Sequence, residues 1–200
     1  CSEMAAALVT GIVTMMFNWT MLRYVGEEGI AAVTIIMYVL MFASSLYTGY
    51  SYGVAPMLSY YYGEGNREKL HRLVSTSLRV IAVISLVTAA ASFVATEPLV
   101  AVFARPADPV YGLAVTGNRI CTVALLFIGF NIFASGMFTA LSNGVVSGVL
   151  AFSRSFVFMM LTMLTLPVLL GVNGIWLATP AAELMALAMS ALLFLRYRGR

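Results

Sequence analysis

A carboxylic acid inside an apolar segment is the feature of this sequence best suited to chemistry. Glu183 stands between Ile175 and Leu195, in an apolar run long enough to cross a bilayer. A charge at that depth is costly, so the carboxyl must be protonated, paired or in contact with a wet cavity. Because burial disfavours the charged form, Glu183 is a candidate proton carrier. The alternative is a neutral or paired carboxyl that serves helix packing.

Three other polar side chains lie in apolar segments and are candidates for a substrate or ion pathway. Asn18 and Asn131 carry amides that either hydrogen-bond across helices or line a polar cavity. Arg119 either extends to the membrane interface or pairs with an acid, and the alternative is a role in substrate passage. Methionines such as Met15 and Met41 suit a cavity for varied apolar cations and suit ordinary packing equally well.

The sequence contains no pattern typical of an enzyme. It has no P-loop, no HExxH and no Gly-x-Ser-x-Gly element. Its two cysteines, Cys1 and Cys121, lack the spacing of a zinc site. We therefore expect no catalytic residue, cofactor or metal site. Nucleic acid is not expected as a partner either, because the net charge of +3 is not gathered into a basic cluster with stacking aromatics.

The elements that must position these side chains are membrane-spanning helices. Hydrophobic residues make up 62% of the 200 positions and charged residues 10%, with a mean hydropathy of +0.96. A soluble domain is only about 45–50% apolar, so the lipid bilayer is the expected surroundings. At about 20 residues per crossing, the length predicts an all-α integral membrane fold of about six spans in a single domain, 1–200. The predicted spans are 4–24, 29–62, 70–95, 109–140, 145–171 and 175–196.

Turn residues and charges set the ends and the orientation of these spans. Asn66 and Asp108 are predicted helix N-caps, and Asp108 is followed by Pro109 at the first helical position. The positive-inside rule then places both ends of the chain in the cytoplasm and predicts a multi-pass protein of the cell (inner or plasma) membrane. The basic residues assigned to the cytoplasmic side are Arg67, Lys69, Arg72, Arg79, Arg154, Arg196, Arg198 and Arg200.

One segment resembles a known family. The stretch from Gly49 to Asn66, which includes Pro56, Tyr60 and Gly63-Glu-Gly-Asn66, is followed by basic residues up to Arg72. It is similar to the segment that joins the eighth and ninth helices of multidrug and toxic compound extrusion (MATE) transporters. Weaker similarities follow in order: Ala31-Ala32, Glu97-Pro-Leu to Phe103, and Gly174-Ile-Trp-Leu-Ala-Thr-Pro-Ala-Ala-Glu183.

The resemblance implies two six-helix lobes around a central cavity, with this chain as the C-terminal lobe. The N-terminal lobe, where many bacterial members keep a coupling carboxylate, is then the missing partner. Residue 1 is Cys rather than Met, so we expect either a fragment of a longer protein or a stand-alone half. Some members carry ion-binding acids in the seventh and tenth helices. The matching stretches here offer Gly11, Asn18 and Asn131 instead, and Glu3 lies close to a span end.

The resemblance implies a secondary active multidrug exporter, which exchanges small organic cations or other drugs for H+ or Na+. An alternative is a lipid-linked precursor flippase of the same superfamily, for which a groove with several Arg or Lys would be expected; only Arg119 and Arg154 lie near the spans. A further alternative is a non-transporting membrane fragment.

Overall fold

The computed structural model describes the backbone of residues 2–198 and the side chains of residues 8–196. Every regular element in that part of the chain is a helix. The side chains of Cys1, Glu3, Arg198 and Arg200, which enter the predictions above, lie outside the described residues.

Five helical segments with described side chains are long and apolar enough to cross a membrane. The segment α1 precedes them and coincides with the first predicted span. The predicted all-α membrane fold is therefore confirmed. In chain order the elements are α1 (Ser2–Tyr24), α2 (Glu27–Gly63), α3 (Arg67–Val94), the short α4 (Thr96–Ala101), α5 (Pro109–Cys121), η1 (Thr122–Ala124), α6 (Leu125–Ala140), α7 (Gly144–Phe152), η2 (Ser153–Phe158), α8 (Met159–Leu170) and α9 (Val172–Arg198).

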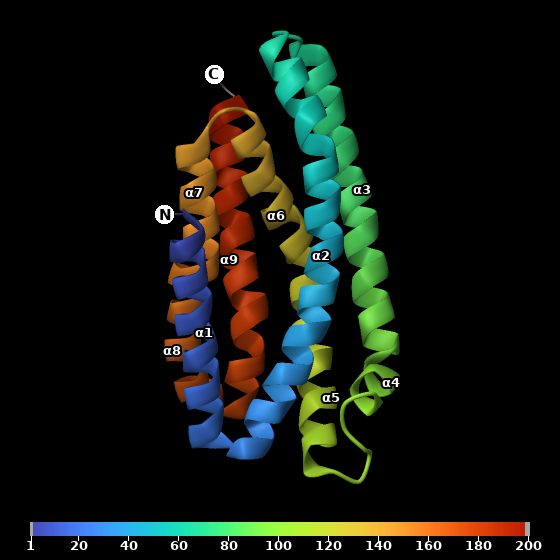
Figure 1. Cartoon of the computed structure of the whole chain (residues 1–200), viewed down its shortest axis with the longest axis vertical. Helices are drawn as coiled ribbons and strands as arrows, with labels where there is room; N and C mark the ends of the chain where they lie inside the picture. The colour runs from blue at the N-terminus through green and yellow to red at the C-terminus, as the bar shows by residue number, and fades with distance from the viewer. Residues whose placement is uncertain (1, 199–200) are drawn as a thin grey trace.

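The helices form an upright bundle in which successive spans run up and down (Figure 1). Two of the spans are composite: α5, η1 and α6 form one continuous rod, and α7, η2 and α8 form another. The hairpin of α2 and α3 extends beyond the other helices at one end (Figure 1). The element α6 packs against α2, α3, α7 and α9, so it lies at the centre of the lobe.

Glycines and caps set the turns between the spans. Gly26, between α1 and α2, has a φ of 99°, which an L side chain adopts only with strain. Asn66 caps α3 as predicted, because its side chain accepts a hydrogen bond from the Lys69 N–H at 3.1 Å. Asp108 is the N-cap residue of α5 and Pro109 its first residue, as predicted, but the side chain of Asp108 does not form the capping hydrogen bond. Its carboxylate accepts from the Arg105 N–H at 2.9 Å and makes no hydrogen bond to α5.

Burial follows the position of each span in the bundle. In the Pro109–Ala140 rod, half of an 18-residue apolar stretch is buried inside the bundle. In the Gly144–Leu170 rod the buried share of such a stretch is 17%, so this rod is an outer helix. One core cluster lies between α1, α2, α5 and α9 around Met21, Ile36 and Trp176. A second lies between α2, α3 and α6 around Leu58, Ile81 and Phe133. Large apolar side chains elsewhere are exposed, as lipid-facing surfaces require.

Candidate functional site

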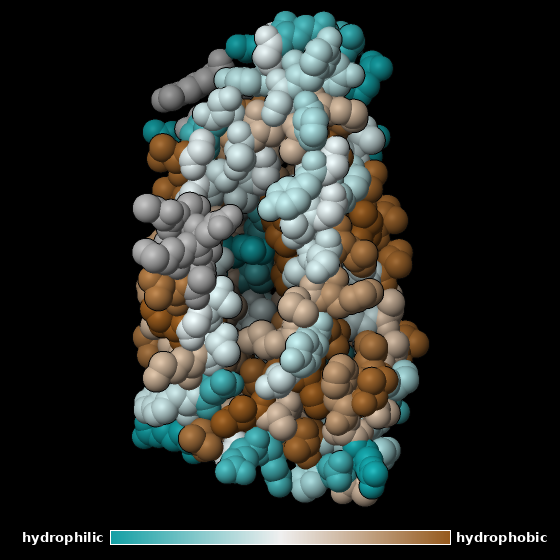
Figure 2. Space-filling view, in the orientation of Figure 1, coloured by the Kyte–Doolittle hydropathy of each residue, from teal (hydrophilic) through white to brown (hydrophobic). Residues whose placement is uncertain are grey.

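A cavity of about 800 Å³ opens between α2 and an opposite wall made by α6, α7, η2 and α9. In the space-filling view it is a hollow in the middle of one face, with hydrophilic residues at its floor (Figure 2). Its lining is rich in hydroxyl groups and contains one amide, Asn131, and one charged side chain, Arg154; no acid lines it. A polar hollow at mid-span is a normal position for a substrate or ion site in a membrane transporter.

Glu183 lies directly behind this lining. The residue is 7% exposed and sits on α9. Its Oε2 accepts a hydrogen bond from the Asn131 side chain at 2.7 Å, and its backbone carbonyl accepts from the same amide at 2.9 Å. Its Oε1 is 3.4 Å from a guanidinium nitrogen of Arg154. The sequence singled out Glu183 and Asn131 separately, and the structure brings them together.

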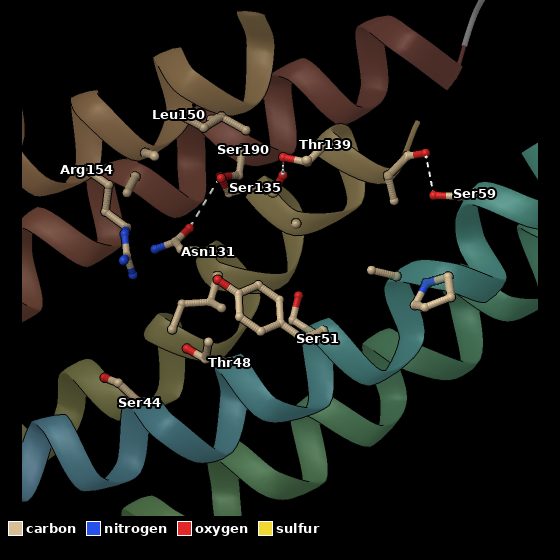
Figure 3. Close-up of a pocket in the computed structure, with 18 residues that line it drawn as sticks. Ser44, Thr48, Ser51, Ser59, Asn131, Ser135, Thr139, Leu150, Arg154 and Ser190 are labelled. Carbon is tan, nitrogen blue, oxygen red and sulfur yellow. Dashed lines mark hydrogen bonds between the residues drawn. The ribbon is translucent and has the colours of Figure 1, made fainter. Parts of the chain in front are cut away.

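Arg154 reaches Glu183 from the outer rod. It lies in η2, a π-helical turn between the α-helices α7 and α8. At about 1.5 Å per residue, it is about 15 Å along the axis from Gly144. The structure therefore corrects its assignment as a cytoplasmic topology signal, because it is part of the cavity wall. Its side chain is 26% exposed, and its guanidinium points into the cavity (Figure 3). π-helical turns inside α-helices frequently occur at functional sites.

The opposite wall carries three hydroxyls in a row on α2. Ser44, Thr48 and Ser51 follow one another at the spacing of a helix face and all line the cavity (Figure 3). Within the described residues none of the three makes a hydrogen bond. By contrast, the Ser190 hydroxyl on α9 donates to the side-chain amide oxygen of Asn131 at 3.3 Å. The α2 hydroxyls are thus available to a ligand or to water. Their spacing was visible in the sequence, but only contact with a polar cavity distinguishes such a row from ordinary small packing residues.

Two of the predicted site residues lie elsewhere. Arg119 pairs with Glu97 at 2.9 Å, and both side chains are largely exposed, as the pairing alternative anticipated. Asn18 is half-buried on α1 and does not line the cavity. No methionine lines the cavity either. Met15 and Met41 are exposed away from it, which fits the alternative of packing against lipid.

A second polar cluster, missed in the sequence, lies away from the cavity. Asn118 is 1% exposed, and its amide donates to the hydroxyls of Thr96 at 3.0 Å and Ser92 at 3.4 Å. Ser92 also shares a hydrogen bond with Thr122 at 3.0 Å. These side chains satisfy one another and join α3, α4, α5 and η1. We therefore read the cluster as structural.

Comparison with known proteins identifies the fold. The family model named MatE matches residues 4–164. The chain is similar to an outward-facing multidrug resistance MATE family transporter of the MOP superfamily, with a TM-score of 0.86 and 22% identity over 96% of this chain and 43% of that one. An inward-facing structure from the same family gives the same TM-score, 0.86, so the lobe is compatible with either state.

Two further solved structures are similar to the chain. A mutant of the Vibrio cholerae MATE transporter VcmN has a TM-score of 0.89 and 16% identity, over 100% of this chain and 45% of that one. A MOP superfamily transporter from Pyrococcus furiosus, whose binding pocket is described as reversed in polarity, has a TM-score of 0.85 and 21% identity over 96% and 43%. At these identities the likeness shows the fold alone.

The chain spans less than half the length of these solved transporters, which fits one lobe. No curated protein matches it in sequence. The family model nevertheless covers most of the chain, and the structural matches cover nearly all of it. The chain belongs to the MatE family, whose members are membrane transporters and not enzymes.

Proposed function

We propose that the chain is the C-terminal lobe of a secondary active multidrug exporter, a cation-coupled antiporter of small organic cations or other drugs. The observation that carries this proposal is the cavity between α2 and the α6–α9 wall, which a buried carboxylate borders. An antiporter needs a place for cargo and a group that binds the coupling cation, and the two adjoin here. A six-helix N-terminal lobe completes the central cavity and allows alternating access.

Glu183 is the residue we assign to the coupling cation. Its carboxylate is held by Asn131 and Arg154, so it is fixed in place at the edge of the cavity. Of the two candidate cations, the site favours H+ over Na+. Na+ needs several oxygen ligands, and the groups beside this carboxylate are the N–H donors of Asn131 and Arg154, whereas a proton needs only one carboxylate oxygen. Asn131 and Arg154 act as positioning residues in this scheme.

The alternatives receive less support from the site. A flippase for lipid-linked phosphates would be expected to line its groove with several basic side chains, and this cavity has Arg154 alone among the residues described. A pocket of reversed polarity, as described for the Pyrococcus furiosus relative, would favour a different cargo. Binding of a cationic and of an anionic probe distinguishes the two cases. We place the protein in the inner or plasma membrane, with both ends cytoplasmic.

Efflux of ethidium from energised cells tests this function. Cells would express the complete reading frame that contains the chain, as wild type, Glu183→Gln and Arg119→Gln, at equal membrane abundance. We expect efflux by wild type and by Arg119→Gln, which breaks an ion pair outside the cavity, and loss of efflux by Glu183→Gln. Dissipating the proton gradient should abolish the wild-type activity, and removing Na+ should not. Absence of efflux by the wild type would contradict the proposed function.

A further inference from the structure

The charge on the cavity wall depends on the protonation of one acid. Arg154 is the charged side chain in the lining, and Glu183 is its partner behind the lining. With Glu183 ionised, the two charges cancel and the wall is neutral. With Glu183 protonated, the guanidinium charge is left uncompensated, because a guanidinium stays charged at any physiological pH.

This arrangement needs no movement of the backbone. The Glu183 carboxyl keeps its hydrogen bond to the Asn131 amide in either state, since its Oε2 accepts that bond at 2.7 Å. The proton can be carried on Oε1, the oxygen that faces Arg154 at 3.4 Å. Protonation then removes the ion pair and leaves the guanidinium directed into the cavity (Figure 3).

Other charges do not mask the effect. Among the described residues, η1, α6, α7 and α8, which pack around α9, carry no ionisable side chain. The remaining ionisable side chains described on α1, α2, α5 and α9 lie toward the helix ends, are engaged in another contact, or are tyrosines. They are Arg23 and Tyr24 at the end of α1; Glu27 and Glu28 at the start of α2; Arg119, paired with Glu97, and Cys121, bonded to the Trp176 carbonyl, on α5; Arg196 near the end of α9; and the tyrosines Tyr38, Tyr47, Tyr50, Tyr52, Tyr60, Tyr61 and Tyr62 on α2 and Tyr111 on α5, of which Tyr52 lines the cavity.

We propose that Arg154 is the specificity-determining residue that makes cargo binding depend on the sign of the cargo's charge, through the protonation of Glu183. The proposal rests on the proposed function, in which Glu183 binds the coupling proton. A cationic drug enters while the pair is neutral, and proton uptake leaves Arg154 unbalanced, which expels the cation. The α2 hydroxyls Ser44, Thr48 and Ser51 supply hydrogen bonds to cargo on the opposite wall without affecting this charge.

Saturable binding of two probes of opposite charge tests the proposal. The probes are ethidium, a permanent cation, and anilinonaphthalene sulfonate, an anion whose charge does not change with pH in this range. The protein is the product of the complete reading frame in nanodiscs of zwitterionic lipid. At an effective dielectric of about 20, one unit charge about 8 Å away changes Kd by roughly tenfold or more. On acidification, wild-type binding of ethidium should weaken and binding of the anion should strengthen.

The variants should change the affinities for the cationic and the anionic probe in opposite directions, which a merely structural role of Arg154 would not produce. Glu183→Gln keeps Arg154 unbalanced, so it should bind ethidium roughly tenfold more weakly and the anion more tightly, with little dependence on pH. Arg154→Gln leaves the acid unbalanced, so ethidium binding should strengthen. The double variant Arg154→Gln/Glu183→Gln removes both charges and should bind both probes with no pH dependence, and it contains no unpaired buried acid that would destabilise the fold. Arg119→Gln should behave as wild type.

The proposal would be overturned if acidification changed the Kd of both probes in the same direction. It would also be overturned if the double variant kept the pH dependence of the wild type. The outcome is separable from that of the proposed function. If the protein exports nothing, ethidium efflux is absent even though the signs in the binding assay are as expected. If the protein is an exporter but Arg154 has no such role, efflux is present and the charge pattern is not.

Discussion

The side-chain amide of Asn131 on α6 donates to both the carboxylate and the backbone carbonyl of Glu183 on α9, at 2.7 and 2.9 Å. One amide thus holds two helices together at the edge of the cavity. Both residues are buried, at 3% and 7% exposure, so the bonds are shielded from lipid.

Replacing Asn131 by Ala should destabilise the folded lobe by about 1–2 kcal/mol, because a buried carboxylate loses a donor and two helices lose their link. The measurement is the free energy of unfolding in a detergent and SDS titration. Asn18→Ala is the matched control: it removes an amide from a half-buried position outside the cavity, and it should cost less. Equal losses in the two variants would contradict the assignment.

The Arg154–Glu183 pair should show strong coupling in a double-mutant cycle. Arg154→Gln leaves an uncompensated acid that is 9% exposed, which costs about 3 kcal/mol or more for a buried pair. Removing both charges should recover part of that stability. We therefore expect Arg154→Gln/Glu183→Gln to unfold at a higher SDS fraction than Arg154→Gln alone. Additive effects of the two substitutions would mean that the pair is not formed in the membrane.

The spans were predictable from the sequence because hydropathy and turn residues act locally. The charge-free run before Tyr62 and the Asn66 cap mark α2 and the start of α3 within a few residues of the observed ends. The bonding of Asp108 was less predictable, because its carboxylate accepts from the Arg105 N–H, three residues earlier, and not from an N–H of α5.

The site was only partly predictable because hydropathy does not determine how a helix is rotated about its axis. Glu183 and Asn131 were recognised as isolated polar residues, yet their contact depends on how α6 and α9 face each other. Arg154 looked like a topology signal until the π-helical turn η2 placed it on the cavity wall. Arg119 had a comparable sequence environment and pairs outside the cavity, so a basic residue near a span does not by itself reveal a site.

The first turn of α9 should tolerate no side chain at Gly174, where it packs against the end of α8. A Cβ at this position would overlap the backbone carbonyl of Leu166, and backbone atoms cannot move aside as a flexible side chain can. Gly174→Ala should therefore sharply reduce the yield of folded protein in gel filtration. Gly148→Ala is the matched control, since a Cβ there meets nothing within 4 Å. Normal folding of Gly174→Ala would show that α8 and α9 are not this close.

Thiol labelling should distinguish the cavity from the lipid-facing surface and from the core. In a Cys1→Ser background, Cys121 is 3% exposed with its thiol bonded to the Trp176 carbonyl, so it should react with a water-soluble maleimide only after denaturation. A cysteine in place of Thr48 faces the polar cavity and should react in the folded protein. A cysteine in place of Leu86, which is 65% exposed on the apolar surface of α3, should not, because lipid suppresses the reactive thiolate. Labelling at Leu86 without labelling at Thr48 would mean that water reaches the outer face of α3 and not the proposed cavity.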